Sequence, residues 1–323
     1  MLTTVRLMVK ALRFELFAMT AAVILLGVAA LYMTWRLGQV AIPPQCLYSN
    51  VPFGQALDPA VDAACEVARA RFYDLVNTAG QVMAFAVLVP AVAGLLIGVP
   101  LVARELESGT ASLAWTLSRS RSSWYLRRAV PLALIVSAAL VLPAIATFAL
   151  EGASQPNVSP FASFNDASLR GPVIVARGLL ALGVGVLAGA VIGRQLPAVI
   201  VGGLVAIALL TVIAAGVQTY TDSLAEWRTA DHTSSGDLAI NSGFRDKTSG
   251  AFVDNATGYS DAPTLPDGGP DDSWISARYD EAVFAVPGVR YREVAAVETL
   301  VTGGLAVVTL GLGGLVVSRR RPL

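Results

Sequence analysis

The chain of 323 residues is 55% hydrophobic and only 14% charged, with a mean hydropathy of +0.64. A single soluble core of this size cannot bury that much apolar surface, so the composition places the chain in a lipid bilayer. The 23 basic residues balance the 23 acidic ones, which argues against nucleic acid as a partner.

Six apolar runs are each long enough to cross about 30 Å of hydrocarbon as a helix. They lie at about residues 14–35, 82–102, 130–150, 173–192, 196–217 and 297–317. The first run ends in bulky residues, where a cleaved signal peptide needs small ones, so we expect a retained span. The sequence therefore predicts an all-α integral membrane protein, with residues 1–323 forming one transmembrane domain of six helices.

The N-terminal segment, residues 1–13, is basic on one side. On a helix, Arg6, Lys10 and Arg13 share one face and apolar residues share another, which predicts an interfacial helix. The alternative is a simple basic flank of the first span.

Basic residues also follow the second span, separate the fourth from the fifth, and close the chain. With six spans, all these groups fall on one side, which the positive-inside rule makes cytoplasmic. We therefore expect a multi-pass protein of the cell membrane with both termini in the cytoplasm. The loops at residues 36–81, 151–172 and 218–296 then face outward.

The first outward loop contains both cysteines of the chain, Cys46 and Cys65. An exterior compartment favours a disulfide between them, and the alternative is two free thiols in a loop.

The loop at residues 104–128, between the second and third spans, carries the most informative pattern. Gly109 can take the left-handed conformation that ends a helix, and Thr110 can begin the next one. This predicts a short coupling helix beneath the membrane, in which Leu113 and Trp115 fill an apolar groove on a soluble partner. The alternative is an ordinary connecting loop. The candidate partner-contact residues are Arg104, Glu105, Glu107, Gly109, Thr110, Leu113 and Trp115.

Charge is rare inside the predicted spans. Arg177 lies about one turn inside the fourth span, and Glu298 stands at the start of the sixth. Intramembrane charges are candidates for a transport pathway or an ion pair, and Arg177 and Glu298 are the candidate pair, although their spacing alone does not establish the contact. The alternative is that Arg177 extends outward to the membrane surface.

The fourth span also carries small residues at every fourth position: Ala181, Gly185, Gly189 and Gly193. Such a stripe lets another helix approach closely. Gly94 and Gly98 form a shorter stripe of the same kind in the second span.

The sequence offers no energy source of its own. The cores of the second, third, fifth and sixth spans have no ionisable residue for an ion relay, and the chain has no G-x-x-x-x-G-K-[ST] phosphate loop. It also shows no clustered catalytic residues and no metal-ligand set, because His232 is the only histidine. A machine driven by ATP would need a partner subunit.

The run Ala103-Arg-Glu-Leu-Glu-Ser-Gly-Thr110 resembles the coupling segment of the permeases of type-2 ABC exporters. Gly193-Arg-Gln-Leu-Pro-Ala198 resembles the tight turn between the fourth and fifth spans of small actinobacterial-type members. Glu298-Thr299 resembles the Glu-Thr pair with which their sixth span often begins. The loop at residues 218–296 departs from them, since it lacks an aromatic-rich motif before the last span.

The resemblance implies a permease subunit that moves an amphipathic or hydrophobic substrate, such as a drug, an antibiotic, a peptide or a lipid, out of the cell. It implies a second permease copy or sister subunit and two ATP-binding subunits, which carry the ATP and Mg²⁺. This chain would then hold no cofactor and would be no enzyme by itself. The alternatives are a non-transporting membrane sensor or assembly protein and an integral membrane enzyme.

Overall fold

The computed structural model describes residues 13–40, 42–43, 46–47, 59–116, 118, 120–229, 232–265 and 270–320. In this part of the chain, six helices are long and apolar enough to cross a membrane. They are α2 (Arg13–Gly38), α3 (Pro59–Gly98), α6 (Arg121–Ser154), α7 (Pro172–Ile192), α8 (Gln195–Asp222) and α11 (Tyr291–Arg319). Each predicted span lies inside one of these helices or its direct continuation. The predicted interfacial helix at residues 1–13 falls almost wholly outside the described residues.

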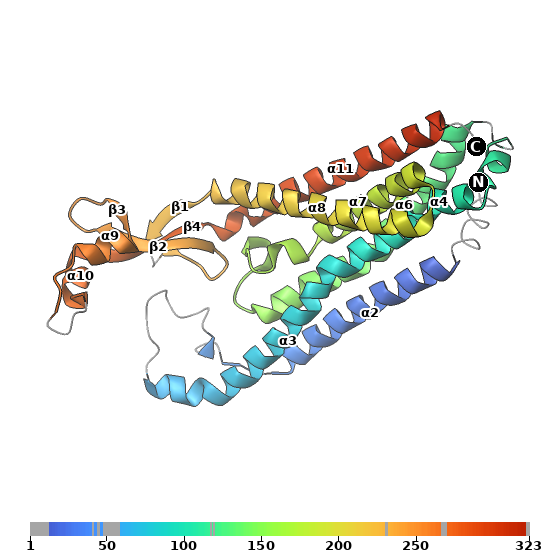
Figure 1. Ribbon diagram of the computed structural model, residues 1–323. Helices are drawn as coiled ribbons and strands as arrows, with labels where there is room; N and C mark the ends of the chain where they lie inside the picture. The colour runs from blue at the N-terminus through green and yellow to red at the C-terminus, as the bar shows by residue number, and fades with distance from the viewer. Residues whose placement is uncertain are drawn as a thin grey trace.

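The six helices form an elongated bundle with both described chain ends at one end (Figure 1). We call this the terminal end and the opposite one, which carries a β-sheet, the sheet end. Helix α7 lies at the centre and packs against α3, α6, α8 and α11. Its core residues Leu180, Leu182 and Val186 are fully or almost fully buried.

The stripe of small residues on α7 faces α3. A Cβ atom built on Gly189 would lie 2.6 Å from the carbonyl oxygen of Val99, and one on Gly185 would lie 3.0 Å from that of Leu95. A side chain at either position would push the two helices apart, so the glycines permit backbone contact between α3 and α7.

Helix α3 is longer than a bilayer requires. Its 40 residues extend about 60 Å at about 1.5 Å per residue, twice the thickness of the hydrocarbon. The sequence analysis assigned residues 59–81 to a loop, whereas the structure makes them the first half of this helix. A disulfide between Cys46 and Cys65 ties the preceding chain to this half.

The sheet end is formed by the connection between α8 and α11. Its four strands are β1 (Glu226–Thr229), β2 (Leu238–Asp246), β3 (Phe252–Asp254) and β4 (Tyr279–Val286), in the order β1-β4-β2-β3, with every pair antiparallel. Two short helices, α9 (Asn255–Ser260) and α10 (Asp272–Arg278), accompany them. The sequence analysis described residues 218–296 only as a loop and missed this sheet.

Aromatic side chains cover one face of the sheet. Trp227 on β1 lies across Gly243 on β2 and stacks on Phe252 of β3, with ring planes 11° apart. The glycine is required here, because a Cβ atom would lie 2.7 Å from the indole ring. The ring thus links both edge strands and stabilises a small sheet that has few strands of its own.

A hydrogen-bonded turn closes the far end of the same sheet. Asp246 accepts hydrogen bonds from the backbone N–H groups of Ser249 and Thr248 and from Arg278 Nε, at 2.8, 2.8 and 3.1 Å. These bonds stabilise the charged carboxylate and lower the pKa of Asp246 to about 2.

The sheet is attached to the bundle through the connection between α6 and α7, which includes η3 (Pro160–Ala162) and η4 (Ala167–Leu169). Phe164 N donates to the carbonyl of Gly236 at 2.9 Å. On the sheet side, Asp237 accepts hydrogen bonds from Gly288 N at 2.8 Å and from Arg228 at 2.9 Å. The sheet is therefore fixed to the connection between α6 and α7 and to the segment that leads into α11.

Candidate functional site

The first candidate site is the segment between α3 and α6 at the terminal end. Helix α4 (Pro100–Glu107) continues α3, and α5 (Ala111–Thr116) is the short helix that follows. Between them Gly109 has φ +70°, the left-handed conformation that favours glycine. The hydroxyls of Ser108 and Thr110 hydrogen bond each other at 2.9 Å across this turn. The chain thus breaks where the sequence analysis places the turn.

Glu105 and Trp115 are held inside the chain. Glu105 forms an ion pair with Arg128 of α6, whose guanidinium carbon lies 4.4 Å from the centre of the Trp124 ring. Trp115 meets Trp124 edge to face, with ring centres 6.3 Å apart, and is only 8% exposed. Both side chains thus help to fix α4 and α5 against α6, and their contact with a soluble partner stays a prediction.

The other charged residues of α4 contact neighbouring helices. Glu107 Oε2 accepts a hydrogen bond of 3.0 Å from Gln195 N, at the N-terminus of α8, where a negative charge is favourable. Arg104 lies 3.8 Å from Glu15 of α2. Both remain partly exposed at the surface, so their internal contacts do not exclude a partner.

Leu113 is the predicted contact residue that the chain leaves uncovered. It lies on α5, and 62% of its surface is exposed. Thr110, next to the turn, is also exposed. Arg104, Glu107 and Gly109 are exposed at the same end.

Hydrogen bonds from two arginines, which were not predicted from the sequence, join the same segment to α7 and α11. The Arg121 side chain donates to the carbonyl of Arg320, and the guanidinium of Arg320 donates to the carbonyls of Ala190 and Val191 at the end of α7. Arg121 also lies 5.0 Å from the Trp115 ring centre. From the sequence, these arginines indicate only the orientation of the chain in the membrane. Their contacts could not be predicted, because backbone carbonyls as partners leave no sequence pattern.

The second candidate site is at the sheet end, where two ion pairs are buried. Arg177 Nη2 on α7 donates to Glu298 Oε1 on α11 at 2.6 Å, and Ser168 Oγ donates to Glu298 Oε2 at 3.2 Å. The Arg177 and Glu298 side chains are 10% and 4% exposed. The structure thus joins the two residues that the sequence analysis proposed as a pair, and Arg177 does not extend to the surface.

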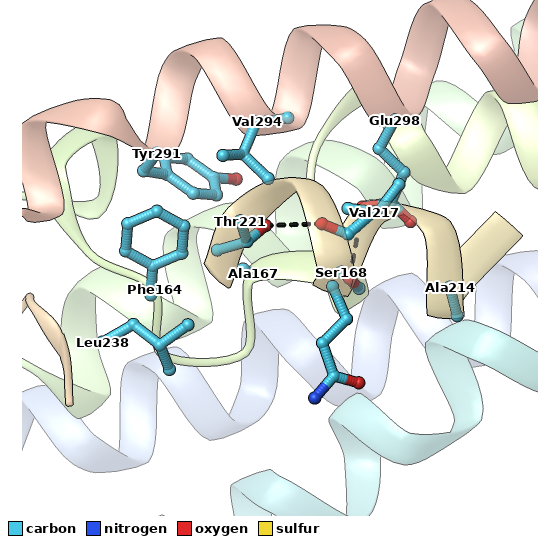
Figure 2. A pocket seen from close by; sticks show the side chains of 12 residues that line it. Phe164, Ala167, Ser168, Ala214, Val217, Thr221, Leu238, Tyr291, Val294 and Glu298 are labelled. Carbon is cyan, nitrogen blue, oxygen red and sulfur yellow. Dashed lines mark hydrogen bonds between the residues drawn. The ribbon is translucent and has the colours of Figure 1, made fainter. Parts of the chain in front are cut away.

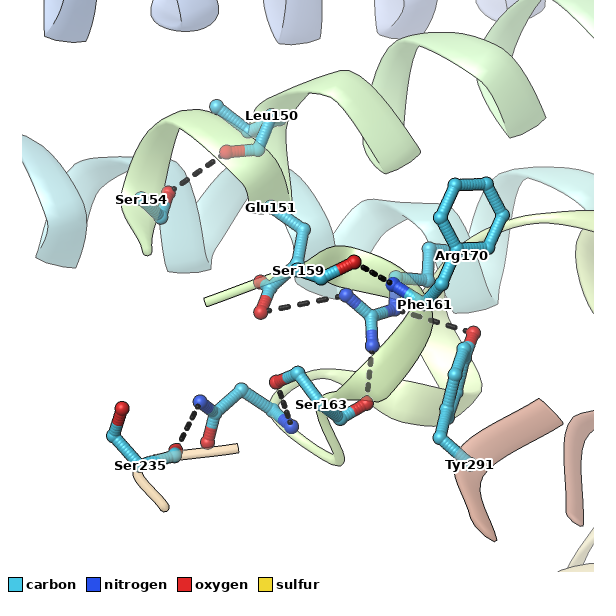
Figure 3. A network of polar contacts seen from close by, with 10 residues as sticks. Leu150, Glu151, Ser154, Ser159, Phe161, Ser163, Arg170, Ser235 and Tyr291 are labelled. Atoms are coloured by element: carbon cyan, nitrogen blue, oxygen red, sulfur yellow. Dashed lines mark hydrogen bonds and ion pairs between the residues drawn. The ribbon is translucent and has the colours of Figure 1, made fainter. Parts of the chain in front are cut away.

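The second buried pair, Arg170 with Glu151, was not predicted. Their side chains are 0% and 3% exposed, and the closest nitrogen and oxygen atoms are 3.4 Å apart. Arg170 also donates to the carbonyl of Ser163 at 2.5 Å and to the Tyr291 hydroxyl at 3.3 Å, so it joins α6, α11 and the connection before α7 (Figure 3). Arg170 lies outside every apolar run, so it was not among the charged residues found inside the predicted spans.

A cavity of about 270 Å³ lies beside these pairs, between the ends of α8 and α11 and the segment 164–168 (Figure 2). In the view of Figure 2, Phe164, Leu238 and Tyr291 gather at one end of the cavity and Ser168 and Glu298 at the other. The cavity is thus apolar at one end and carries a hydrogen-bond acceptor at the other.

Acidic residues around this end differ in their surroundings. Burial raises the pKa of Asp166, and the positive charge of the nearby Arg170 partly offsets this increase.

Within the described ranges, no group of three or more His, Cys, Asp or Glu residues is arranged to hold a metal ion.

The comparisons with known proteins agree with the membrane architecture. A family model described as ABC-2 membrane transporter related matches residues 16–218, which is more than half of the chain. The match begins in α2 and ends in α8, so it contains the α4–α5 segment and excludes the sheet and α11. No curated protein and no solved structure matches the chain.

Proposed function

The chain belongs to the family of ABC-2 membrane transporter related proteins, and on that premise we propose that it is the permease subunit of an ATP-driven exporter. The substrate is an amphipathic or hydrophobic molecule that leaves the cell. ATP and Mg²⁺ bind to a separate ATP-binding subunit, present twice, and a second permease completes the pathway. The terminal end is cytoplasmic and the sheet end faces outward, as the distribution of basic residues favours.

The observation that carries this proposal is the α4–α5 segment. A connection that only linked two spans would need a few residues. Instead, the chain builds two short helices, fixes them with the Glu105–Arg128 pair and the Trp115–Trp124 contact, and leaves Leu113 exposed. A rigid segment with one exposed apolar side chain is suited to enter a groove on a soluble partner.

On this proposal, closure of the ATP-binding subunits pushes on α5. The push reaches α6 through the two tryptophans and reaches α11 through Arg121 and the carbonyl of Arg320. A conformational change at the spans then follows from differential binding of the ATPase to two states of the permease.

The test uses the chain together with ATP-binding subunits encoded near it, purified and inserted into nanodiscs. ATP hydrolysis is measured with and without the permease. Leu113→Glu is expected to abolish the stimulation by the permease, because a charge replaces the apolar contact. Ser122→Glu is the matched control: Ser122 is also exposed at the terminal end, at the start of α6, where an acidic residue is tolerated. Equal stimulation by both variants, or failure of every ATP-binding subunit to bind, would contradict the proposal.

A further inference from the structure

The cavity at the sheet end has the chemistry of a binding site. Phe164, Leu238 and Val294 supply an apolar wall, while Glu298 and Ser168 supply polar atoms at the other end (Figure 2). Three elements far apart in the sequence meet around it: the connection before α7, the last turns of α8 and the first turns of α11. We propose that this cavity binds one end of a neutral amphipathic molecule, an alkyl or aryl group that carries a hydroxyl or amide donor.

The size of the cavity sets the first limit. Sites for drug-sized ligands enclose about 300–1,000 Å³, and this one holds about 270 Å³. It therefore accommodates a single apolar group, and the rest of a larger molecule would extend past Ala214 and Gln218, the exposed lining residues of α8.

The state of Glu298 sets the second limit. Its carboxylate accepts one hydrogen bond at each oxygen, from Arg177 and from Ser168. Each carboxylate oxygen has two lone pairs, so Glu298 can accept a further bond from a ligand. Its negative charge is already balanced by Arg177, and an added ammonium would leave a net positive charge in a nearly dry site. A hydroxyl or amide N–H is therefore favoured over an amine.

The site goes beyond the proposed export function, because binding needs neither ATP nor a partner. Two sources supply this chemistry: a bilayer lipid and a free amphiphile. The shared feature is the apolar chain with a neutral donor, and the experiment separates the sources.

The full chain is purified into phosphatidylcholine nanodiscs and irradiated with one of three probes of equal chain length. They are a diazirine-bearing decanol, the corresponding decylamine, and a diacylglycerol, a bilayer lipid with a free hydroxyl, that carries the diazirine in its acyl chain. Labelled residues are mapped by mass spectrometry. The decanol probe is expected to label residues that line the cavity, and unlabelled decanol should compete. The decylamine probe should label them several-fold less at equal membrane concentration.

Two variants fill the cavity from different elements: Ala214→Trp from α8 and Ala167→Leu from η4. Both are expected to reduce cavity labelling to background. Ala215→Trp is the matched control, since Ala215 is the exposed neighbour on α8 and does not line the cavity. Size-exclusion profiles identify any variant that misfolds, and the other variant then decides.

The acyl-chain probe distinguishes the sources. Labelling of the cavity by the lipid identifies a bilayer lipid as the occupant, whereas labelling by decanol alone identifies a free amphiphile. The proposal is overturned by label spread evenly over the lipid-facing helices, by label that persists in the filled variants, or by equal labelling with decylamine.

Discussion

The buried pair of Arg177 and Glu298 gives the sharpest test of how charge is tolerated in this bundle. Their nitrogen and oxygen atoms are 2.6 Å apart, and both side chains are nearly inaccessible. Removing one partner of such a pair leaves an uncompensated buried charge, which costs about 3–5 kcal/mol. We therefore expect Arg177→Gln to lower the free energy of unfolding by about 3 kcal/mol or more, with Ser168 as the remaining donor to Glu298.

The double-mutant cycle separates pairing from packing. Glu298→Gln alone should also destabilise, while Arg177→Gln combined with Glu298→Gln should cost clearly less than the sum, with a coupling of about 0.5–3 kcal/mol. Unfolding in detergent is followed by circular dichroism against denaturant. Glu293→Gln is the control, because its pair with Arg290 is exposed and therefore contributes little to stability. Additive effects, or single variants no worse than the control, would refute the reasoning.

Three further predictions concern the turn, the disulfide and the sheet. Gly109→Val should lower the free energy of unfolding by roughly 1 kcal/mol and reduce stimulation of the ATPase, because a β-branched residue is strained at this left-handed φ. Gly109→Asn should retain the stimulation, because asparagine tolerates the left-handed conformation and a Cβ atom there meets no neighbour. With the sheet end outside, a membrane-impermeant maleimide should label Cys46 and Cys65 in intact cells only after reduction; labelling that requires lysis would reverse the orientation. Loss of the disulfide should lower the free energy of unfolding by about 3 kcal/mol, since the bond joins residues separated by 19 positions in the sequence. Because the folded-state pKa of Asp246 is lowered to about 2 from 3.8, the stability it gives the sheet is present above about pH 4 and lost as the pH falls towards 2. Asp246→Asn should remove this loss of stability at low pH, which is followed by tryptophan fluorescence during acid titration. An acid transition unchanged by the substitution would disprove the role of Asp246.

The parts of the structure that follow from composition were predictable from the sequence. A run of about 20 apolar residues has few alternatives to a membrane helix, because the backbone must satisfy its hydrogen bonds internally. The turn at Gly109 was predictable because left-handed backbone selects glycine. Arg177 and Glu298 were identified as candidates because an unpaired charge is costly in a membrane, but their spacing in the sequence did not establish the contact.

The missed features depend on contacts between distant residues. Strands β1 and β3 have only four and three residues, too few for a recognisable pattern, and β2 pairs with β4 across the intervening helices. The ion pair of Glu105 was also missed, because its partner, Arg128, comes from the next long helix. The contact of Trp115 with Trp124 was missed for the same reason.

The two polar ties between α7 and α11 stand at opposite ends of the bundle. Glu298 and Arg320 are 22 residues apart on one continuous helix and its cap, which is about 33 Å at about 1.5 Å per residue. That distance is close to the hydrocarbon thickness of about 30 Å, so the two ties are spaced as the two surfaces of a membrane are. Between them, α7 and α11 meet through small residues such as Gly183 and Ala306. Helices joined at both ends and closely packed between them resist sliding, so α7 and α11 form one rigid unit to which both the α4–α5 segment and the sheet-end cavity are attached.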